Sequence, residues 1–161
     1  MGKREEAIPR FVGYVRLSAM DKPFISRAEE RRLLEHGISS FELGHDDAKG
    51  VLLAVAQANN ISVERDIDRR MVPILERFGG RRKKIAKKKF REAAAIYKGL
   101  AGGTLTDDEA RFRVKRTMEE NGFRPRRAGF LLSRRWYDRI GRRRRAGDGS
   151  ADPSQRQVER L

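Results

Sequence analysis

Apolar side chains recur every three or four residues along most of this chain, the spacing that places them on one face of an α-helix. The longest such stripe consists of Val63, Ile67, Met71, Ile74 and Phe78. Residues 11–17 form a β-like run, which we interpret as a helix or an irregular segment. The pattern predicts an all-α fold, a compact bundle of about five to six helices.

Polar residues and glycines mark where these helices begin and end. Ser26 and Thr106 each stand three residues before a glutamate, the arrangement of a capping box. We predict helices over residues 26–36, 46–59, 62–79, 106–121 and 126–140, and another in the basic stretch that ends at Gly99. The other predicted caps are Gly37 after the first helix, Asp46 or Asp47 before the second, and Ser62 before the third.

Ser26, Ser62 and Thr106 each follow an aliphatic residue, which can pack against the first turn of the helix. Their spacing, 36 and then 44 residues, is typical of stacked helical repeats. The same layout also arises independently wherever one helix follows another, because helix capping requires it. The sequence leaves helix–loop–helix repeats and independent helices open.

The domain organisation follows from where the helical pattern begins and ends. We expect an N-terminal arm over residues 1–10, a helical bundle domain over 11–123, a basic arginine-rich helix or extension over 124–145, and a disordered tail over 146–161. The tail is rich in Gly, Asp, Ser and Gln and cannot bury enough apolar surface to fold. No run of residues has the length and hydrophobicity of a signal peptide or membrane span, so we expect a cytoplasmic protein.

Charged residues make up 38% of the chain, and their signs are unevenly distributed. Residues 1–79 hold thirteen basic and thirteen acidic residues, whereas residues 80–98 hold nine basic and one acidic. Residues 111–145 hold fourteen basic and three acidic. Arginine-rich genome composition would explain the arginines but not the lysine cluster at 83–89. The asymmetry predicts a polyanion as partner, with nucleic acid, DNA or RNA, as the first candidate.

The predicted nucleic-acid-binding residues form two groups. The first is a cationic helix face opposite the apolar face of Phe90 and Tyr97: Lys84, Lys88, Arg91 and Lys98. The second lies in the arginine-rich extension: Arg124, Arg126, Arg127, Arg134, Arg135, Arg139, Arg142, Arg143, Arg144 and Arg145. Guanidinium groups bind phosphate in a bidentate manner. Trp136 lies among the arginines, where it either stacks on a base or packs in the bundle.

Catalytic chemistry has little support in these residues. The chain has no cysteine, which excludes disulfides, thiolate metal sites and cysteine nucleophiles. Its two histidines are His36, expected in a last helical turn, and His45, beside two aspartates that are better explained as helix caps. We therefore expect a non-enzymatic protein without metal or cofactor.

Two segments resemble a known helical family. They are Ala-x-Ala-Asn-Asn-Ile-Ser-x-Glu, ending at Glu64, and Leu-Ala-Gly-Gly-Thr-Leu-Thr-Asp-Asp-Glu, from Leu100 to Glu109. Both are similar to the helix–loop–helix motif of the TerB-like domain of tellurite-resistance and DjlA-type proteins, which implies an all-helical bundle over roughly residues 10–123. The family's metal-associated loop aspartate is replaced here by Asn59 or Gly102, so the resemblance does not extend to metal binding.

A second resemblance is to RecX-type regulators, which are basic arrays of three-helix repeats. It is carried by Ser-Arg-Ala-Glu-Glu-Arg-Arg-Leu-Leu-Glu-His-Gly, from Ser26 to Gly37, and by Gly-Phe-Arg-Pro-Arg-Arg, from Gly122 to Arg127. The residues between these segments do not follow that family's pattern.

Two other functions fit the same charge pattern. The first is a peripheral adaptor on anionic membranes, whose interfacial residues would be Phe130, Leu131, Leu132, Trp136 and Ile140. The second is an assembly subunit that docks its basic tail on an acidic protein partner. The sequence does not establish an oligomeric state.

Overall fold

A computed structural model describes residues 2–127 and 133–141 and confirms the all-α prediction. The six long helices are α1 (Gly2–Ser18), α2 (Arg27–Phe41), α3 (His45–Ala58), α4 (Glu64–Gly79), α5 (Lys87–Leu100) and α6 (Asp107–Glu120). The described part of the C-terminal extension contains one further helical turn, α7 (Arg135–Asp138). The short elements are β1 (Phe24–Ile25), β2 (Ser62–Val63), the 3-10 turn η1 (Gly80–Arg82), β3 (Lys84–Ile85) and β4 (Arg124–Pro125).

The chain builds the same unit twice, in the order helix, strand, helix, helix, strand. In each unit the two strands pair in parallel, β1 with β2 and β3 with β4. Asn59 and Asn121, 62 residues apart, end the third helix of their units in the same way. Each donates a side-chain hydrogen bond to the carbonyl four residues earlier and precedes a residue with positive φ, Asn60 or Gly122. The repeat is therefore a three-helix unit of about 62 residues.

This register differs from the candidate repeat anchored at Ser26, Ser62 and Thr106, which was one of the two alternatives that the sequence left open. Ser26 opens the second helix of the first unit, whereas Thr106 opens the third helix of the second unit. Ser62 lies in β2, and its hydroxyl donates to the carbonyl of Leu100 instead of capping a helix. The three positions share a capping chemistry but do not occupy equivalent places in the fold.

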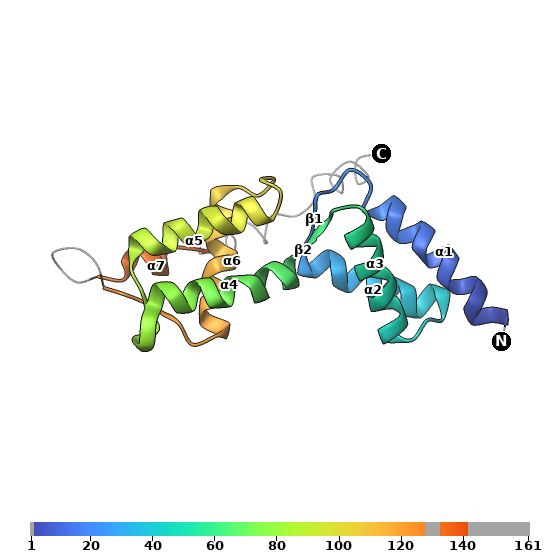
Figure 1. Ribbon diagram of the computed structural model, residues 1–161, viewed down its shortest axis with the longest axis horizontal. Coiled ribbons are helices and arrows are strands. Elements are labelled where there is room, and N and C mark those ends of the chain that lie inside the picture. The colour runs from blue at the N-terminus through green and yellow to red at the C-terminus, as the bar shows by residue number, and fades with distance from the viewer. Residues whose placement is uncertain (1, 128–132, 142–161) are drawn as a thin grey trace, which may run out of the picture.

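Each unit has its own hydrophobic core, and α4 leads from the junction into the second unit (Figure 1). The first core is centred on Phe11, Val15, Ile25, Leu52 and Val55. The second is centred on Met71, Leu75, Phe90, Tyr97 and Met118. Phe24 belongs by sequence to the first unit but packs in the second core, so the two units are joined by apolar contact as well as by chain connection.

Two of the predicted caps are confirmed and several boundaries are corrected. Ser26 and Thr106 both form complete capping boxes, with Glu29 and Glu109. The helix that opens at Ser26 does not stop at Gly37 but continues to Phe41, and Gly37 is buried against Phe11 and Ala48 of the neighbouring helices. His36 is consequently inside α2, where its ring lies 4.2 Å from that of Tyr14, centroid to centroid.

Other corrections concern helix ends nearer the termini. The residue at the N-cap of α3 is Gly44, with Asp46 and Asp47 in the first turn, and the residue at the N-cap of α4 is Val63. α1 extends through residues 2–10, which were expected to form an arm, and includes residues 11–17. Arg126 and Arg127 precede no long helix in the described residues, because β4 pairs with β3 and holds the chain extended there.

Gly37 lies where α2 packs tightly against α1 and α3, and this contact is testable. A Cβ atom at Gly37 would lie 2.8 Å from Cζ of Phe11 and 3.1 Å from Cβ of Ala48. Phe11 is fully buried and cannot move aside freely. We expect Gly37→Ala to lower the free energy of unfolding by about 1–3 kcal/mol, measured by urea denaturation, because it overpacks the core.

Gly50→Ala is the matched control, because a Cβ at this helical position has nothing within 4 Å. There the usual advantage of alanine over glycine in a helix should raise stability by about 0.5–1 kcal/mol. Equal effects of the two substitutions would contradict the close approach at Gly37.

Candidate nucleic-acid interface

Two buried carboxylates lie at the junction of the units, one turn apart on α4. Glu64 and Asp68 are only 2% and 5% exposed. Burying a carboxylate is costly unless it is paired and hydrogen-bonded, so the cations around them must be accounted for. We call this set the charge clamp; its members are Arg27, Glu64, Asp68, Arg113, Arg116 and Glu120.

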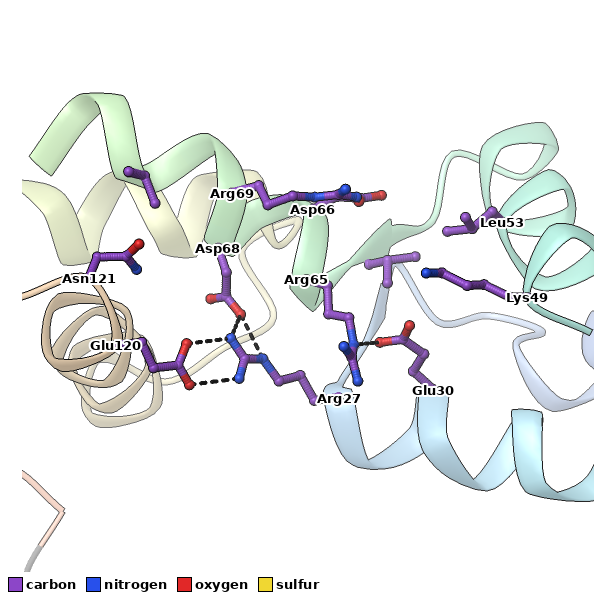
Figure 2. Close-up of a pocket in the computed structure, with 12 residues that line it drawn as sticks. Arg27, Glu30, Lys49, Leu53, Arg65, Asp66, Asp68, Arg69, Glu120 and Asn121 are labelled. Atoms are coloured by element: carbon purple, nitrogen blue, oxygen red, sulfur yellow. Dashed lines mark hydrogen bonds and ion pairs between the residues drawn. The ribbon is translucent and has the colours of Figure 1, made fainter. Parts of the chain in front are cut away.

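Arg27 connects the two units within the charge clamp. Figure 2 shows its guanidinium reaching from α2 to lie between Asp68 and Glu120. It is 2.7 Å from Oδ2 of Asp68, and its two terminal nitrogens each donate to one oxygen of Glu120 at 2.8 Å. The backbone N–H of Arg27 donates to Glu64, also at 2.8 Å. One residue of the first unit therefore binds three carboxylates of the second.

Helix α6 supplies the remaining cations of the charge clamp. Arg113 donates to Glu64 at 3.1 Å, and Arg116 donates to Glu64 at 2.7 Å and to Asp68 at 3.0 Å. The hydroxyls of Tyr97 and Thr117 also donate to Asp68. Three guanidinium groups thus balance three carboxylates.

The charge clamp has the properties of a structural junction. The hydrogen bonds from Arg27 hold the pKa of Glu120 below its usual range. A carboxylate with a lowered pKa stabilises the fold above its ordinary pKa, and this contribution is lost as pH falls through the lowered value. Burial raises the pKa of Tyr97, whose hydroxyl stays protonated as a donor. Because guanidinium groups already occupy the carboxylates, the cluster offers no free base.

A different arrangement of charge lies at the far end of the second unit. Six cationic side chains, together with Gly79 and Pro125, line a groove of about 620 Å³, and no acidic residue is among the described residues of its lining. We call it the arginine groove; its cations are Arg81, Arg82, Lys84, Arg126, Arg127 and Arg134. Within the described ranges, none of the six forms an ion pair.

Backbone pairing brings these cations together from distant parts of the sequence. α4 ends at Gly79, and η1 turns the chain toward β3, with Lys83 in the left-handed region at φ 48°. The N–H of Arg124 then donates to the carbonyl of Lys83 at 2.8 Å, and the N–H of Arg126 donates to that of Ile85 at 2.7 Å. The short parallel pair β3–β4 therefore fixes residues 81–84 beside residues 124–127.

A second groove, of about 650 Å³, lies between α5, α6 and α7. We call it the aromatic groove; it is lined by Lys87, Phe90, Arg91, Asp108, Arg111, Phe112, Trp136, Arg139, Ile140 and Gly141. It contains four cations and one carboxylate, Asp108, which pairs with Arg111 at 3.3 Å. Unlike the arginine groove, it combines positive charge with aromatic surface.

The predicted binding residues divide between these places. Lys84, Arg126, Arg127 and Arg134 line the arginine groove, while Arg91 and Arg139 line the aromatic groove. Lys88, Arg124 and Arg135 are exposed but line neither groove. Lys98 bonds to Asp107 at 2.9 Å, so its charge is already paired. Arg142, Arg143, Arg144 and Arg145 lie outside the described residues.

One assignment within this set is corrected. Lys84 was expected on the same helix face as Lys88 and Arg91, but it lies in β3, before α5 begins at Lys87. Its exposed side chain joins the arginines of β4 and not those of the helix.

Four further cations line the grooves but were not among the predicted binding residues: Arg81, Arg82, Lys87 and Arg111. Arg81 and Arg82 belong to the basic run that starts after Gly80, so the charge count contained their signal. What was missing was the β3–β4 pairing, which determines which cations of the run face those of the extension.

No protein-family model matches this chain, and neither a curated protein nor a solved structure matches it. In the part of the chain that the structure describes, no helix is long and apolar enough to cross a membrane. Among the same residues, no group of three or more His, Asp or Glu is placed to hold a metal ion.

Proposed function

We propose that this protein is a non-enzymatic nucleic-acid-binding protein that holds the phosphate backbone in its arginine groove. The observation that carries the proposal is the lining of that groove: six cations, no carboxylate, and no ion pair among the described residues. Elsewhere in the second unit some cations are paired, as in Lys98–Asp107 and Lys89–Glu92. A surface that only solvates the protein has no need to exclude acidic residues from one concavity.

Electrostatic repulsion gives this arrangement a physical cost that a polyanion removes. Like charges converging in one groove repel each other and oppose the folded state. Phosphates relieve the repulsion, and their binding releases counterions from the nucleic acid. Five of the six cations are arginines, whose planar guanidinium matches the geometry of phosphate oxygens.

The start of α5 supports the same proposal. Its first turn consists of Lys87, Lys88 and Lys89, and Ala86 at the N-cap provides no side-chain cap. Cations are unfavourable at a helix N-terminus, where the helix dipole is positive. The equivalent helix in the first unit, α2, has a capping box and two glutamates in its first turn. The second unit therefore lacks this locally stabilising helix start beside the grooves.

Nucleic acid fits the described residues better than an anionic membrane does. Membrane adaptors insert apolar side chains into the interface. Trp136 and Ile140 instead pack against the core of the second unit, and the indole contacts Phe90 at 5.3 Å between ring centroids. Phe130, Leu131 and Leu132 lie outside the described residues. A concave cationic groove also suits a phosphate backbone more closely than a flat headgroup layer.

The repeated three-helix unit also bears on the family resemblance. We propose the RecX-type likeness as the better guide to architecture, because that family is built from three-helix repeats. The three-helix unit that occurs twice in this chain supports it. The TerB-like likeness implies a single bundle, whereas this chain has two hydrophobic cores.

The full chain should be tested against three polyanions at several salt concentrations. We expect binding to a fluorescently labelled 20-mer oligonucleotide, with affinity that falls steeply as salt increases. We expect much weaker binding to vesicles of phosphatidylcholine with 30% phosphatidylserine and to poly-glutamate of similar length. Equal or tighter binding to vesicles would replace the proposal with the membrane adaptor, and selective binding to poly-glutamate would replace it with the assembly subunit.

A further inference from the structure

We infer that the nucleic acid this protein recognises is single-stranded, with one base stacked on Trp136 in the aromatic groove while the adjoining phosphates occupy the arginine groove. This inference rests on the proposed function and adds the class of nucleic acid and the residue that distinguishes it.

Trp136 has the features of a base-stacking side chain. It is partly exposed, and the exposed part lines the aromatic groove. Edge-to-face contacts with Phe90 and Tyr137, at 5.3 and 5.6 Å between ring centroids, hold the indole in position. A ring that is already fixed loses little conformational freedom when a base stacks on it.

The turn that carries Trp136 is itself anchored to α6. The ammonium of Lys115 donates to the carbonyls of Tyr137 and Ile140 at 3.2 and 3.1 Å. The same ammonium lies 4.8 Å from the centroid of the Tyr137 ring. One lysine thus satisfies the carbonyls at the end of α7 and keeps Trp136 in the groove.

The two grooves are neighbours along two separate segments of the chain. Lys84 lines the arginine groove and Lys87, three residues later, lines the aromatic groove. Arg134 and Trp136, two residues apart, are divided between the grooves in the same way. Two residues of extended chain span at most about 7 Å. A short oligonucleotide can therefore place phosphates in one groove and a base in the other.

Stacking on Trp136 requires a base whose face is free. In a duplex both faces of each base are covered by its neighbours, whereas an unpaired strand can present them. Three cations around the indole, Lys87, Arg91 and Arg139, form no ion pair with another described residue and suit the phosphates that flank such a base. A duplex would engage the cations but gain nothing from the aromatic surface.

The indole nitrogen indicates how selective this contact is. Nε1 of Trp136 is buried and has no hydrogen-bond partner among the described residues. It is therefore not available on the groove surface to read a base edge. The ring would contribute through its π face, which accepts any base, so we expect a preference for single strands with little sequence preference.

The experiment uses Trp136 as its own reporter, because it is the only tryptophan in the chain. The full chain is titrated with a labelled single-stranded 12-mer of thymidine, an abasic strand of the same length and charge, and a 12-base-pair duplex. We expect fluorescence quenching with the thymidine strand and little with the other two. The thymidine strand should also bind about 10- to 100-fold more tightly than the abasic strand, which is the range of one stacking contact.

Trp136→Leu should lower the affinity for the thymidine strand to that for the abasic strand. The affinity for the abasic strand, and the salt dependence of that affinity, should stay unchanged. Phe78→Leu is the matched control, since Phe78 packs against the same core but does not line the groove. If Trp136→Leu does not fold, the affinities of the native chain for the thymidine strand and for the abasic strand still test the stacking inference.

The outcomes separate the two proposals. Equal affinity of the native chain for thymidine and abasic strands, with unchanged fluorescence, overturns the stacking inference and leaves phosphate binding standing. Absence of binding to all three oligonucleotides overturns the proposed function as well.

Discussion

Replacing Asp68 with alanine is expected to lower the free energy of unfolding by about 3–5 kcal/mol, the usual cost of removing one partner from a buried ion pair. Asp68 accepts hydrogen bonds from Arg27, Arg116, Tyr97 and Thr117. Its removal leaves the buried hydroxyl of Tyr97 without its acceptor and the charge clamp with one excess positive charge. Urea denaturation monitored by circular dichroism measures the change.

Asp66→Ala is the matched control on the same helix. The Asp66 side chain is 43% exposed and pairs with Arg69 across one turn. An exposed pair of this kind contributes about 0–1 kcal/mol. If both substitutions cost the same small amount, the charge clamp is hydrated and does not join the units.

Replacing Arg82, Arg126 and Arg134 together with glutamine is expected to weaken binding to an oligonucleotide by about 100- to 1,000-fold near 0.1 M salt. A full charge-assisted hydrogen bond contributes about 1.5–3 kcal/mol, and each lost arginine contact should cost somewhat less than this. These arginines come from η1, from just after β4 and from just before α7, so together they sample three separate segments of the arginine groove.

The salt dependence of binding shows whether those three residues contact phosphates. On single strands the log–log slope changes by about 0.7 for each phosphate contact, so the triple variant should lose about two units. Helix content measured by circular dichroism should not change, because the three side chains form no ion pair or side-chain hydrogen bond in the described structure.

A second triple variant controls for net charge. Arg16, Arg31 and Arg32 are exposed in the first unit and form no ion pair with another described residue. Their replacement with glutamine removes the same charge from the protein but none from the grooves. Equal losses in the two variants would mean that net charge, and not the arginine groove, attracts the nucleic acid.

Part of the fold could be predicted from the sequence because it depends on residues within a few positions of each other. Ser26 and Thr106 were recognised as caps because a capping box involves only four consecutive positions. Most helices followed from apolar spacing, which depends on the helix period alone. The uneven distribution of charge also belongs to the sequence, since counting it requires no contact.

Where a residue's role depends on a distant partner, the sequence was misleading. Gly37 looked like a helix stop, but its lack of a side chain serves the contact with Phe11. Ser62 looked like a cap, but its hydroxyl bonds to Leu100 in the other unit. In both cases a long-range contact determines what the residue does, and single-sequence patterns do not contain that contact.

The sequence by itself determined that the protein is helical, where two of its helices begin, and that its positive charge lies in the second half. Only the tertiary structure decided that the helices form two repeated units, that Arg27 joins them through the charge clamp, and that Arg81 and Arg82 face Arg126 and Arg127. The reason is physical: caps and helical stripes depend on neighbours within a few positions, whereas the grooves depend on the pairing of β3 with β4, forty residues apart in the chain.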